Sequence, residues 1–280
     1  MARILSTRQL TPVTKLFVVD APLIARAARP GQFVILRVRE GGERVPVTIA
    51  DYDSSLGTIT LVVQAVGVTT TRICELEAGE EILDVVGPLG SPVEIPAAGH
   101  VVVVGGGFGT AALLCLMRDL TQRGTRTTAL LGARTKELLI LVEELRRVAT
   151  NVEICTDDGS AGYHGLVTGR LAELIAGQGP GRPDHVIAIG PVVMMRAVAE
   201  ATRPLAIPTL ASMDPLMIDG TGMCGGCRVI VGGQPRFACV DGPCFDAHQV
   251  DFAVAMRRSK TYVREEHLAA ERLAAATGAR

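Results

Sequence analysis

The chain has 280 residues, of which 48% are hydrophobic and only 3% aromatic, with 31 glycines and no tryptophan. This composition excludes a disordered chain, a collagen and a coiled coil. Because 28 basic and 29 acidic residues leave a formal net charge of -1, no overall field draws the protein to nucleic acid or to an anionic membrane, and we expect neither as a partner.

The N-terminal segment predicts neither a leader peptide nor a membrane anchor. It is interrupted by Arg3, Arg8 and Lys15 and has no continuous apolar stretch before a small-residue cleavage site, so we expect a cytoplasmic protein. The longest apolar stretch, residues 101–117, contains four glycines and is shorter than a membrane-spanning helix. It favours a buried strand that turns into a helix, and we expect no membrane insertion.

Residues 1–97 predict a domain built of strands. Short runs rich in Val, Ile and Thr cover residues 13–19, 33–38, 45–50 and 58–66, and glycine or proline turns separate them. Helical periodicity is weak and is confined to residues 70–76 or so. This pattern is typical of an antiparallel β-barrel.

Two segments of the predicted barrel suit an anion. Residues 44–48 place an arginine, a proline and a threonine at the start of a strand, a combination able to hold a diphosphate. Residues 67–72 offer a glycine and three hydroxyls where a short helix begins, so that backbone N–H groups point at a ligand. Either segment alone is more often a turn or a helix cap, and it is the pair that indicates a site.

Residues 98–211 predict a second domain in which strands and helices alternate. Apolar strand segments at 101–104, 127–131, 152–155 and 185–189 are separated by helical segments through 118, at 136–148 and at 168–176, and another helix starts at 192. The alternation indicates a doubly wound α/β domain, with a parallel sheet covered on both faces.

The carboxyl ends of these strands carry the residues that suit a nucleotide. A glycine-rich turn leads from the first strand into a helix, where bare N–H groups can bind a pyrophosphate, although the same residues also suit a simple tight turn. Turns after the later strands meet at the same edge of the sheet. We expect dinucleotide contacts from Gly105, Gly106, Gly107, Gly109, Thr110, Arg134, Asp157, Gly190, Pro191 and Met194, whereas we expect Met195 to be a core residue.

Residues 212–280 form a third segment, rich in glycine, cysteine and aspartate, which ends in an alanine-rich surface helix over 254–280. Cys224, Cys227, Cys239 and Cys244 lie within 21 residues of one another, which favours an iron–sulfur or zinc site over disulfides. The C-x2-C-x11-C spacing is similar to that of a plant-type [2Fe–2S] centre, but the leading position holds Asp219. Either Asp219 or Cys244 is then the fourth ligand.

These motifs together resemble the ferredoxin–NADP reductase-like superfamily. The resemblance covers nearly the whole chain and is strongest to two groups of proteins, dihydroorotate dehydrogenase electron-transfer subunits and the alpha (small) subunit of NADH-dependent ferredoxin:NADP oxidoreductase, or sulfide dehydrogenase. It is carried by residues 30–34, 44–51, 87–90, 105–109, 189–195, 217–229 and 237–243. The second group is favoured because the dihydroorotate pattern has a cysteine where this chain has Asp219.

The resemblance implies three cofactors, FAD in the barrel, NAD(H) or NADP(H) at the glycine-rich edge and a [2Fe–2S] cluster in the C-terminal segment. Carried over by position, the FAD contacts are Arg44, Pro46, Val47, Thr48, Gly67, Thr69 and Thr70. The cluster ligands are Asp219, Cys224, Cys227 and Cys239, with Cys244 as the alternative to Asp219. Hydride then passes between nicotinamide and flavin, and single electrons pass on to the cluster.

The function implied is that of an electron-transfer subunit, and no residue stands out as an acid, base or nucleophile. We expect a larger flavoprotein or iron–sulfur subunit as the partner, similar to the glutamate synthase small subunit, with ferredoxin reached through that complex. An alternative is a dihydroorotate dehydrogenase electron-transfer subunit. An alternative of another class is a non-catalytic nucleotide-sensing module with structural zinc.

Overall fold

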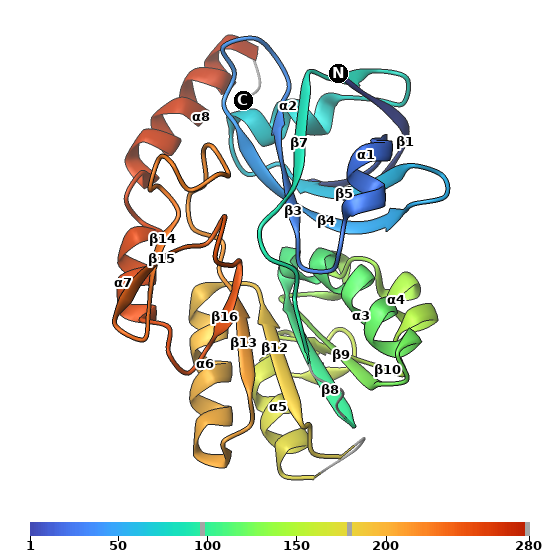
Figure 1. Ribbon diagram of the computed structural model, residues 1–280, viewed down its shortest axis with the longest axis vertical. Helices are drawn as coiled ribbons and strands as arrows, with labels where there is room; N and C mark the ends of the chain where they lie inside the picture. The colour runs from blue at the N-terminus through green and yellow to red at the C-terminus, as the bar shows by residue number, and fades with distance from the viewer. Residues whose placement is uncertain (96–98, 178–180, 278–280) are drawn as a thin grey trace.

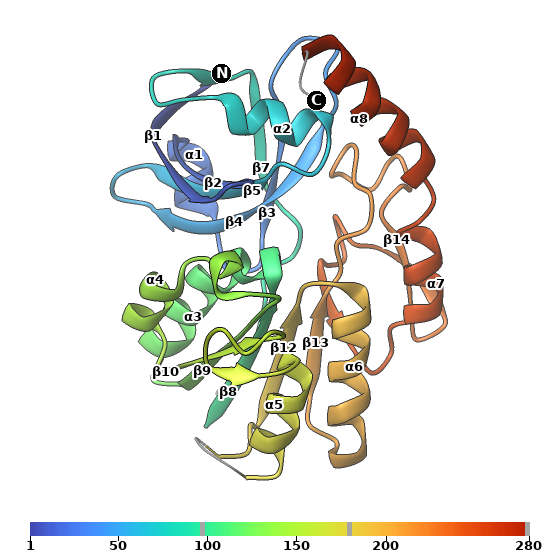
Figure 2. The ribbon, with the colours of Figure 1, turned by 180° about the vertical axis from the view of Figure 1, so that it is seen from behind.

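The computed structural model describes residues 1–95, 99–177 and 181–277. A nearly closed antiparallel barrel lies at one end of the molecule and an α/β domain at the other, as Figure 1 shows. The C-terminal segment runs beside both, and the view from behind in Figure 2 agrees. The predicted combination of a barrel, a doubly wound sheet and a C-terminal segment is confirmed.

The barrel is a seven-stranded sheet with the order β6-β1-β2-β5-β4-β3-β7. Its elements are β1 (Ala2–Thr11), β2 (Thr14–Asp20), α1 (Pro22–Ala27), β3 (Phe33–Arg37), β4 (Val45–Asp53), β5 (Thr58–Gln64), α2 (Val68–Glu75), β6 (Glu81–Ile82) and β7 (Asp84–Leu89). The four predicted strands correspond to β2 to β5 and the weak helical signal to α2. Sequence analysis missed β1, β6, β7 and α1. In β1 only Ile4 and Thr11 are buried, so it shows no clear apolar alternation.

The second sheet has the order β11-β10-β9-β8-β12-β13-β16, and every strand except β16 is parallel to its neighbours. Its strands are β8 (His100–Gly106), β9 (Arg126–Ala133), β10 (Asn151–Thr156), β11 (Tyr163–His164), β12 (His185–Ile189), β13 (Thr209–Ser212) and β16 (Cys244–Asp246). Apolar residues of α3 (Leu113–Gln122) and α4 (Val142–Val148) share one core with this sheet. Those of α5 (Val167–Ile175) and α6 (Val192–Thr202) share another, on the opposite face.

Two helix predictions were wrong in extent. The helix expected over 136–148 is a short 3₁₀ turn, Lys136–Leu138, followed by α4, and Leu141 between them has a left-handed φ of 55°. The helix expected over 254–280 is two helices, α7 (Phe252–Arg258) and α8 (Val263–Thr277), and residues 278–280 lie outside the described part. Residues 138–142 at the first break are all apolar, residues 259–261 at the second are polar, and neither break holds a glycine or proline that would mark the end of a helix.

The C-terminal segment also holds a hairpin of β14 (Arg228–Val231) and β15 (Gln234–Phe237), and its β16 extends the second sheet. The segment is therefore joined to the α/β domain by backbone hydrogen bonds. The boundary predicted between residues 97 and 98 falls in 96–98, outside the described residues. Within the described ranges, no helix has the length and apolar character needed to cross a bilayer.

Candidate cofactor-binding sites

The two anion-suited segments of the barrel lie together. Gly67 is the N-cap of α2, and its amide donates to the Thr70 hydroxyl at 2.9 Å. The Thr69 hydroxyl donates to the carboxylate of Glu43, which directly precedes the exposed Arg44. Thr70 thus caps the helix, and Thr69 joins the two segments to each other. Arg44 faces solvent, where its positive charge is available to an anionic ligand.

Strand β4 presents two different faces. Val47 is buried in the barrel core, so only its backbone is available to a ligand. Pro46 and Thr48 are half-buried on the other face, where they stand opposite Ile35 and Phe33 of β3. Phe33 and Ile35 belong to the core that also includes α5 and α6, so this outer face packs against the rest of the molecule.

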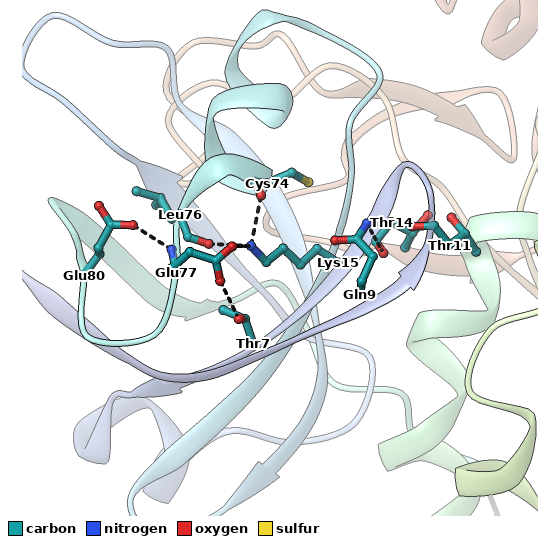
Figure 3. Close-up of polar contacts among 9 residues, drawn as sticks. All are labelled: Thr7, Gln9, Thr11, Thr14, Lys15, Cys74, Leu76, Glu77 and Glu80. Atoms are coloured by element: carbon teal, nitrogen blue, oxygen red, sulfur yellow. Dashed lines mark hydrogen bonds and ion pairs between the residues drawn. The ribbon is translucent and has the colours of Figure 1, made fainter.

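A buried lysine holds the far end of α2, as Figure 3 shows. Lys15 is 5% exposed, and its Nζ donates to the carbonyl oxygens of Cys74 at 3.2 Å and Leu76 at 2.8 Å and to Glu77 Oε1 at 2.7 Å. The Thr7 hydroxyl donates to the other oxygen of Glu77, and the bonds from Lys15 and Thr7 lower the pKa of that carboxyl.

A cation at a helix C-terminus satisfies carbonyls that have no partner within the helix. Lys15 therefore fixes the position of α2, whose other end begins at Gly67. Sequence analysis missed this role. The sign of this role in the sequence was a lysine that is the single charged residue in the predicted strand at residues 13–19.

The glycines at the end of β8 and in the turn that follows it differ in the space around them. A Cβ on Gly105 would lie 3.1 Å from Leu113 side-chain atoms, and one on Gly109 would lie 2.4 Å from the Ile189 carbonyl oxygen. Gly107 has a left-handed φ of 54° with no atom within 4 Å of its Cβ position. The open position at Gly107 is where a ligand can approach the backbone.

The turn after β12 closes on the same glycines. A Cβ on Gly106 would lie 2.4 Å from Met194 Sδ and 3.0 Å from Pro191 Cδ, while Gly190 has a φ of 152° that favours glycine. Met195 is fully buried, as predicted for a core residue.

The turns after β9 and β10 lie against each other at the same edge. The Asp157 amide donates to the Ala133 carbonyl at 3.1 Å, and the Asp158 amide donates to the Arg134 carbonyl at 3.2 Å. The side chains of Arg134 and Asp157 are exposed, and the Thr110 side chain is buried. The candidate dinucleotide residues thus follow β8, β9, β10 and β12 along one edge of the sheet.

This edge is joined to the barrel through β4. The segment Gly107–Ala112 packs against β4, and so does α3. Arg118 of α3 forms an ion pair with Asp51 and donates to the Tyr52 carbonyl at 3.2 Å. Burial raises the pKa of Asp51, and the Arg118 charge opposes that rise. The strand that carries Pro46 and Thr48 is therefore the one on which the dinucleotide edge rests.

The candidate cluster donors form two close pairs. The Asp219 carboxylate accepts hydrogen bonds from the backbone amides of Cys224, at 2.7 Å, and Thr221, at 3.0 Å. These bonds lower the pKa of Asp219, and the bond from Thr221 has the larger effect. The Sγ atoms of Cys227 and Cys239 are 3.1 Å apart in a buried position. Burial, with the Cys227 thiol, raises the pKa of Cys239.

Cys244 lies on the other face of the second sheet. It stands in β16 opposite Ser212 and packs against the core formed with α3, whereas Cys227 and Cys239 belong to the core formed with α6. Burial raises its pKa to about 11. Alternate residues of a strand point to opposite faces, and Cys244 therefore points away from the cysteine pair.

Within the described part of the chain, no three His, Cys, Asp or Glu side chains converge as they would around one metal ion. A tetrahedral zinc needs four donors around one point. A [2Fe–2S] cluster instead takes two protein ligands on each of two irons. The pairs Asp219 with Cys224 and Cys227 with Cys239 fit the second arrangement.

The cluster segment is seated on the barrel. A Cβ on Gly220, next to Asp219, would lie 2.6 Å from Leu89 Cδ1 and 3.0 Å from Ile35 Cγ1, so this contact with the outer face of β3 and β7 requires glycine. Ser91, just after β7, donates its amide to the Gly242 carbonyl at 2.6 Å and its hydroxyl to the Val240 carbonyl at 3.0 Å. Sequence analysis missed Ser91, because a surface serine after a turn carries no signal of a distant partner.

Comparisons with known proteins agree with this geometry. Residues 214–251 match a family model described as the iron–sulfur cluster binding domain of dihydroorotate dehydrogenase B. A Thermotoga maritima protein named as a homologue of the dihydroorotate dehydrogenase B (NAD(+)) electron transfer subunit is 43% identical, over 94% of this chain and 92% of its own length. The dihydroorotate dehydrogenase B (NAD(+)) electron transfer subunit from Desulforamulus reducens is 31% identical, over 89% of this chain and 97% of its own length.

One solved structure is similar to nearly the whole chain, and another shares its fold at low sequence identity. A chain from a study of flavin-based electron bifurcation, the NADH-dependent reduced ferredoxin–NADP oxidoreductase structure, is 40% identical, covers 98% of both chains and superposes with a TM-score of 0.91. A ferredoxin NADP+ reductase from Neisseria gonorrhoeae with bound FAD and NADP is 16% identical over 73% of this chain and 90% of its own, with a TM-score of 0.58. The second likeness is one of fold alone.

Proposed function

The chain belongs to the family of dihydroorotate dehydrogenase B electron-transfer subunits, and within that family we propose that it is the NAD(P)H-oxidising subunit of a complex similar to NADH-dependent ferredoxin:NADP oxidoreductase. The resemblance predicted from the motifs is confirmed. The chain is an FAD- and [2Fe–2S]-dependent oxidoreductase subunit, and it works with a larger partner subunit.

One observation carries the proposal. Pro46 and Thr48 share the outer face of the barrel with Ile35, which contacts Gly220 of the cluster segment, and the Gly107–Ala112 turn packs on the same strand β4. The candidate sites for flavin, dinucleotide and cluster thus meet around one strand pair. Electrons can then pass between them within a single chain.

The residues present fit FAD and a dinucleotide. Arg44 supplies a cation, the first turn of α2 supplies amides from Val68 onward, and Pro46, Val47 and Thr48 line the neighbouring strand. Lys15 keeps α2 in place from its other end. The flavin supplies the exchange between two-electron hydride transfer and one-electron transfer. The turns after β8 and β12 would hold the nicotinamide nucleotide.

The residues also fit a [2Fe–2S] cluster, which Asp219, Cys224, Cys227 and Cys239 would hold. A carboxylate kept ionised by backbone amides is a competent oxygen ligand, and the Gly226 amide donates to Cys224 Sγ at 3.4 Å. The opposite orientation of Cys244 supports Asp219 as the fourth ligand.

The proposal extends to the acceptor. We infer a partner similar to the glutamate synthase small subunit, with ferredoxin reached through it, rather than the FMN subunit of a dihydroorotate dehydrogenase. The support is Asp219, which stands where the dihydroorotate pattern has a cysteine, together with the oxidoreductase chain that covers 98% of both chains with a TM-score of 0.91. Identity alone does not separate the two partners, because the Thermotoga homologue of the dihydroorotate subunit is 43% identical. Two assays of the purified complex test the partners: NADP+ reduction with NADH and reduced ferredoxin as electron donors, and orotate reduction with NADH as the donor.

The ligand assignment is tested on purified chains by iron and sulfide analysis and by EPR after dithionite reduction. Asp219→Ala should lose or alter the EPR signal, while Cys244→Ser should keep it. An unchanged signal in Asp219→Ala together with a lost signal in Cys244→Ser would exchange the two roles.

A further inference from the structure

Helix α7 touches the loop that carries the candidate cluster ligands. Its last residue, Arg258, donates from Nη2 to the carbonyl oxygen of Gly226 at 2.9 Å, across 32 residues of sequence. Gly226 lies between Cys224 and Cys227, and its own amide donates to Cys224 Sγ at 3.4 Å. The residue between two ligands is thus held on one side by a ligand sulfur and on the other by a guanidinium.

This contact places a permanent positive charge beside the ligand loop. A guanidinium stays protonated at any physiological pH and donates in a fixed, planar geometry. Reduction adds one negative charge to an iron–sulfur cluster, and a nearby cation stabilises the reduced state over the oxidised one. Because the Arg258 side chain is exposed, water and salt screen the effect, which makes it moderate and dependent on ionic strength.

We propose that Arg258 is a positioning residue for the Cys224–Cys227 loop and that its charge raises the reduction potential of the cluster. This inference rests on the proposed function, since it assigns a role toward the [2Fe–2S] group. It makes α7 part of the cluster site, although α7 contributes no ligand to it.

The variants separate charge from geometry. Arg258→Gln keeps a hydrogen-bond donor and removes the charge, and Arg258→Lys keeps the charge and removes the planar donor. Arg257→Gln is the matched control, because it makes the same change in net charge at the neighbouring exposed position of α7.

The measurement is the midpoint potential of the cluster in the purified holoprotein, from an EPR-monitored redox titration at low and high salt. Arg258→Gln should lower the equilibrium constant for one-electron reduction about three- to tenfold, where tenfold is 59 mV for a one-electron couple. Arg258→Lys and Arg257→Gln should remain near the native potential. Added salt should lower the midpoint potential of the cluster in the unmodified protein. It should lower that of Arg258→Gln by less.

A potential in Arg258→Gln equal to that in Arg257→Gln, at both salt concentrations, overturns the proposal. The proposed function fails separately, if the unmodified chain gives no [2Fe–2S] signal. Loss of iron from Arg258→Gln, with iron retained in Arg258→Lys and Arg257→Gln, supports a charge requirement at this position.

Discussion

Replacing Lys15 by Met tests whether α2 is fixed from its C-terminus. Methionine keeps an unbranched chain in the buried site and removes the ammonium that serves the Cys74 and Leu76 carbonyls. A hydrogen bond from a charged donor contributes about 1.5–3 kcal/mol, and the pair with Glu77, whose side chain is 66% exposed, adds less than about 1 kcal/mol. Relief of the desolvated ammonium offsets part of this, and we expect a net loss of about 2–4 kcal/mol.

The assay is thermal and urea unfolding of Lys15→Met beside Lys136→Met, whose lysine side chain is 61% exposed. At about 2–4 °C per kcal/mol for a protein of this size, the first variant should lose roughly 5–15 °C in Tm and the second almost nothing. Because α2 begins at Gly67, FAD should also bind about tenfold more weakly to Lys15→Met, which is about 1.4 kcal/mol. Equal unfolding midpoints in the two variants would show that Lys15 does not fix the end of α2.

Gly107→Ala and Gly124→Ala each place a side chain at a left-handed φ with open space around it, so both should cost about 1–2 kcal/mol of stability, but only Gly107→Ala should raise the KM for NADH with an artificial acceptor. An equal KM in the two variants would remove Gly107 from the dinucleotide site. Ser91→Ala removes the bond to the Val240 carbonyl and should slow cluster reduction in stopped-flow traces while flavin reduction by NADH is unchanged; slowing of the flavin step alone would contradict this. Burial lowers the pKa of His248, so the unfolded chain takes up its proton first, and stability should fall as the pH drops below about 6.5. Urea midpoints between pH 8 and 5 should show a shallower fall in His248→Gln, and identical slopes in the two proteins would exclude this histidine as a source.

Much of the fold could be predicted because burial repeats with a regular period. The strands over residues 33–37, 45–53 and 58–64 are rich in β-branched residues between glycine turns, and the second sheet shows its strands as unbroken apolar runs. Strand β1 escaped detection because most of it is exposed. The break at Leu141 escaped because residues 138–142 are all apolar and include no glycine or proline, although Leu141 takes a left-handed φ.

The candidate site was predictable where its chemistry is local in sequence. The glycine-rich turn, the 44–48 segment and the cysteine spacing each lie within a few residues. The roles of Lys15, Ser91 and Arg258 depend on partners dozens of residues away, and spacing carries no information about them. The choice between Asp219 and Cys244 was open for the same reason, since the orientation of Cys244 depends on the pairing of β16 with β13.

We propose that this one chain holds dinucleotide, flavin and cluster around strands β3 and β4. An anaerobic titration of the purified protein with NADH or NADPH, followed by visible absorbance and EPR, tests it most directly. One of the two nucleotides should bleach a flavin band and then produce the signal of a reduced [2Fe–2S] cluster, with iron and sulfide present at two per chain. A colourless protein that contains stoichiometric zinc, and that neither nucleotide changes, would contradict the account.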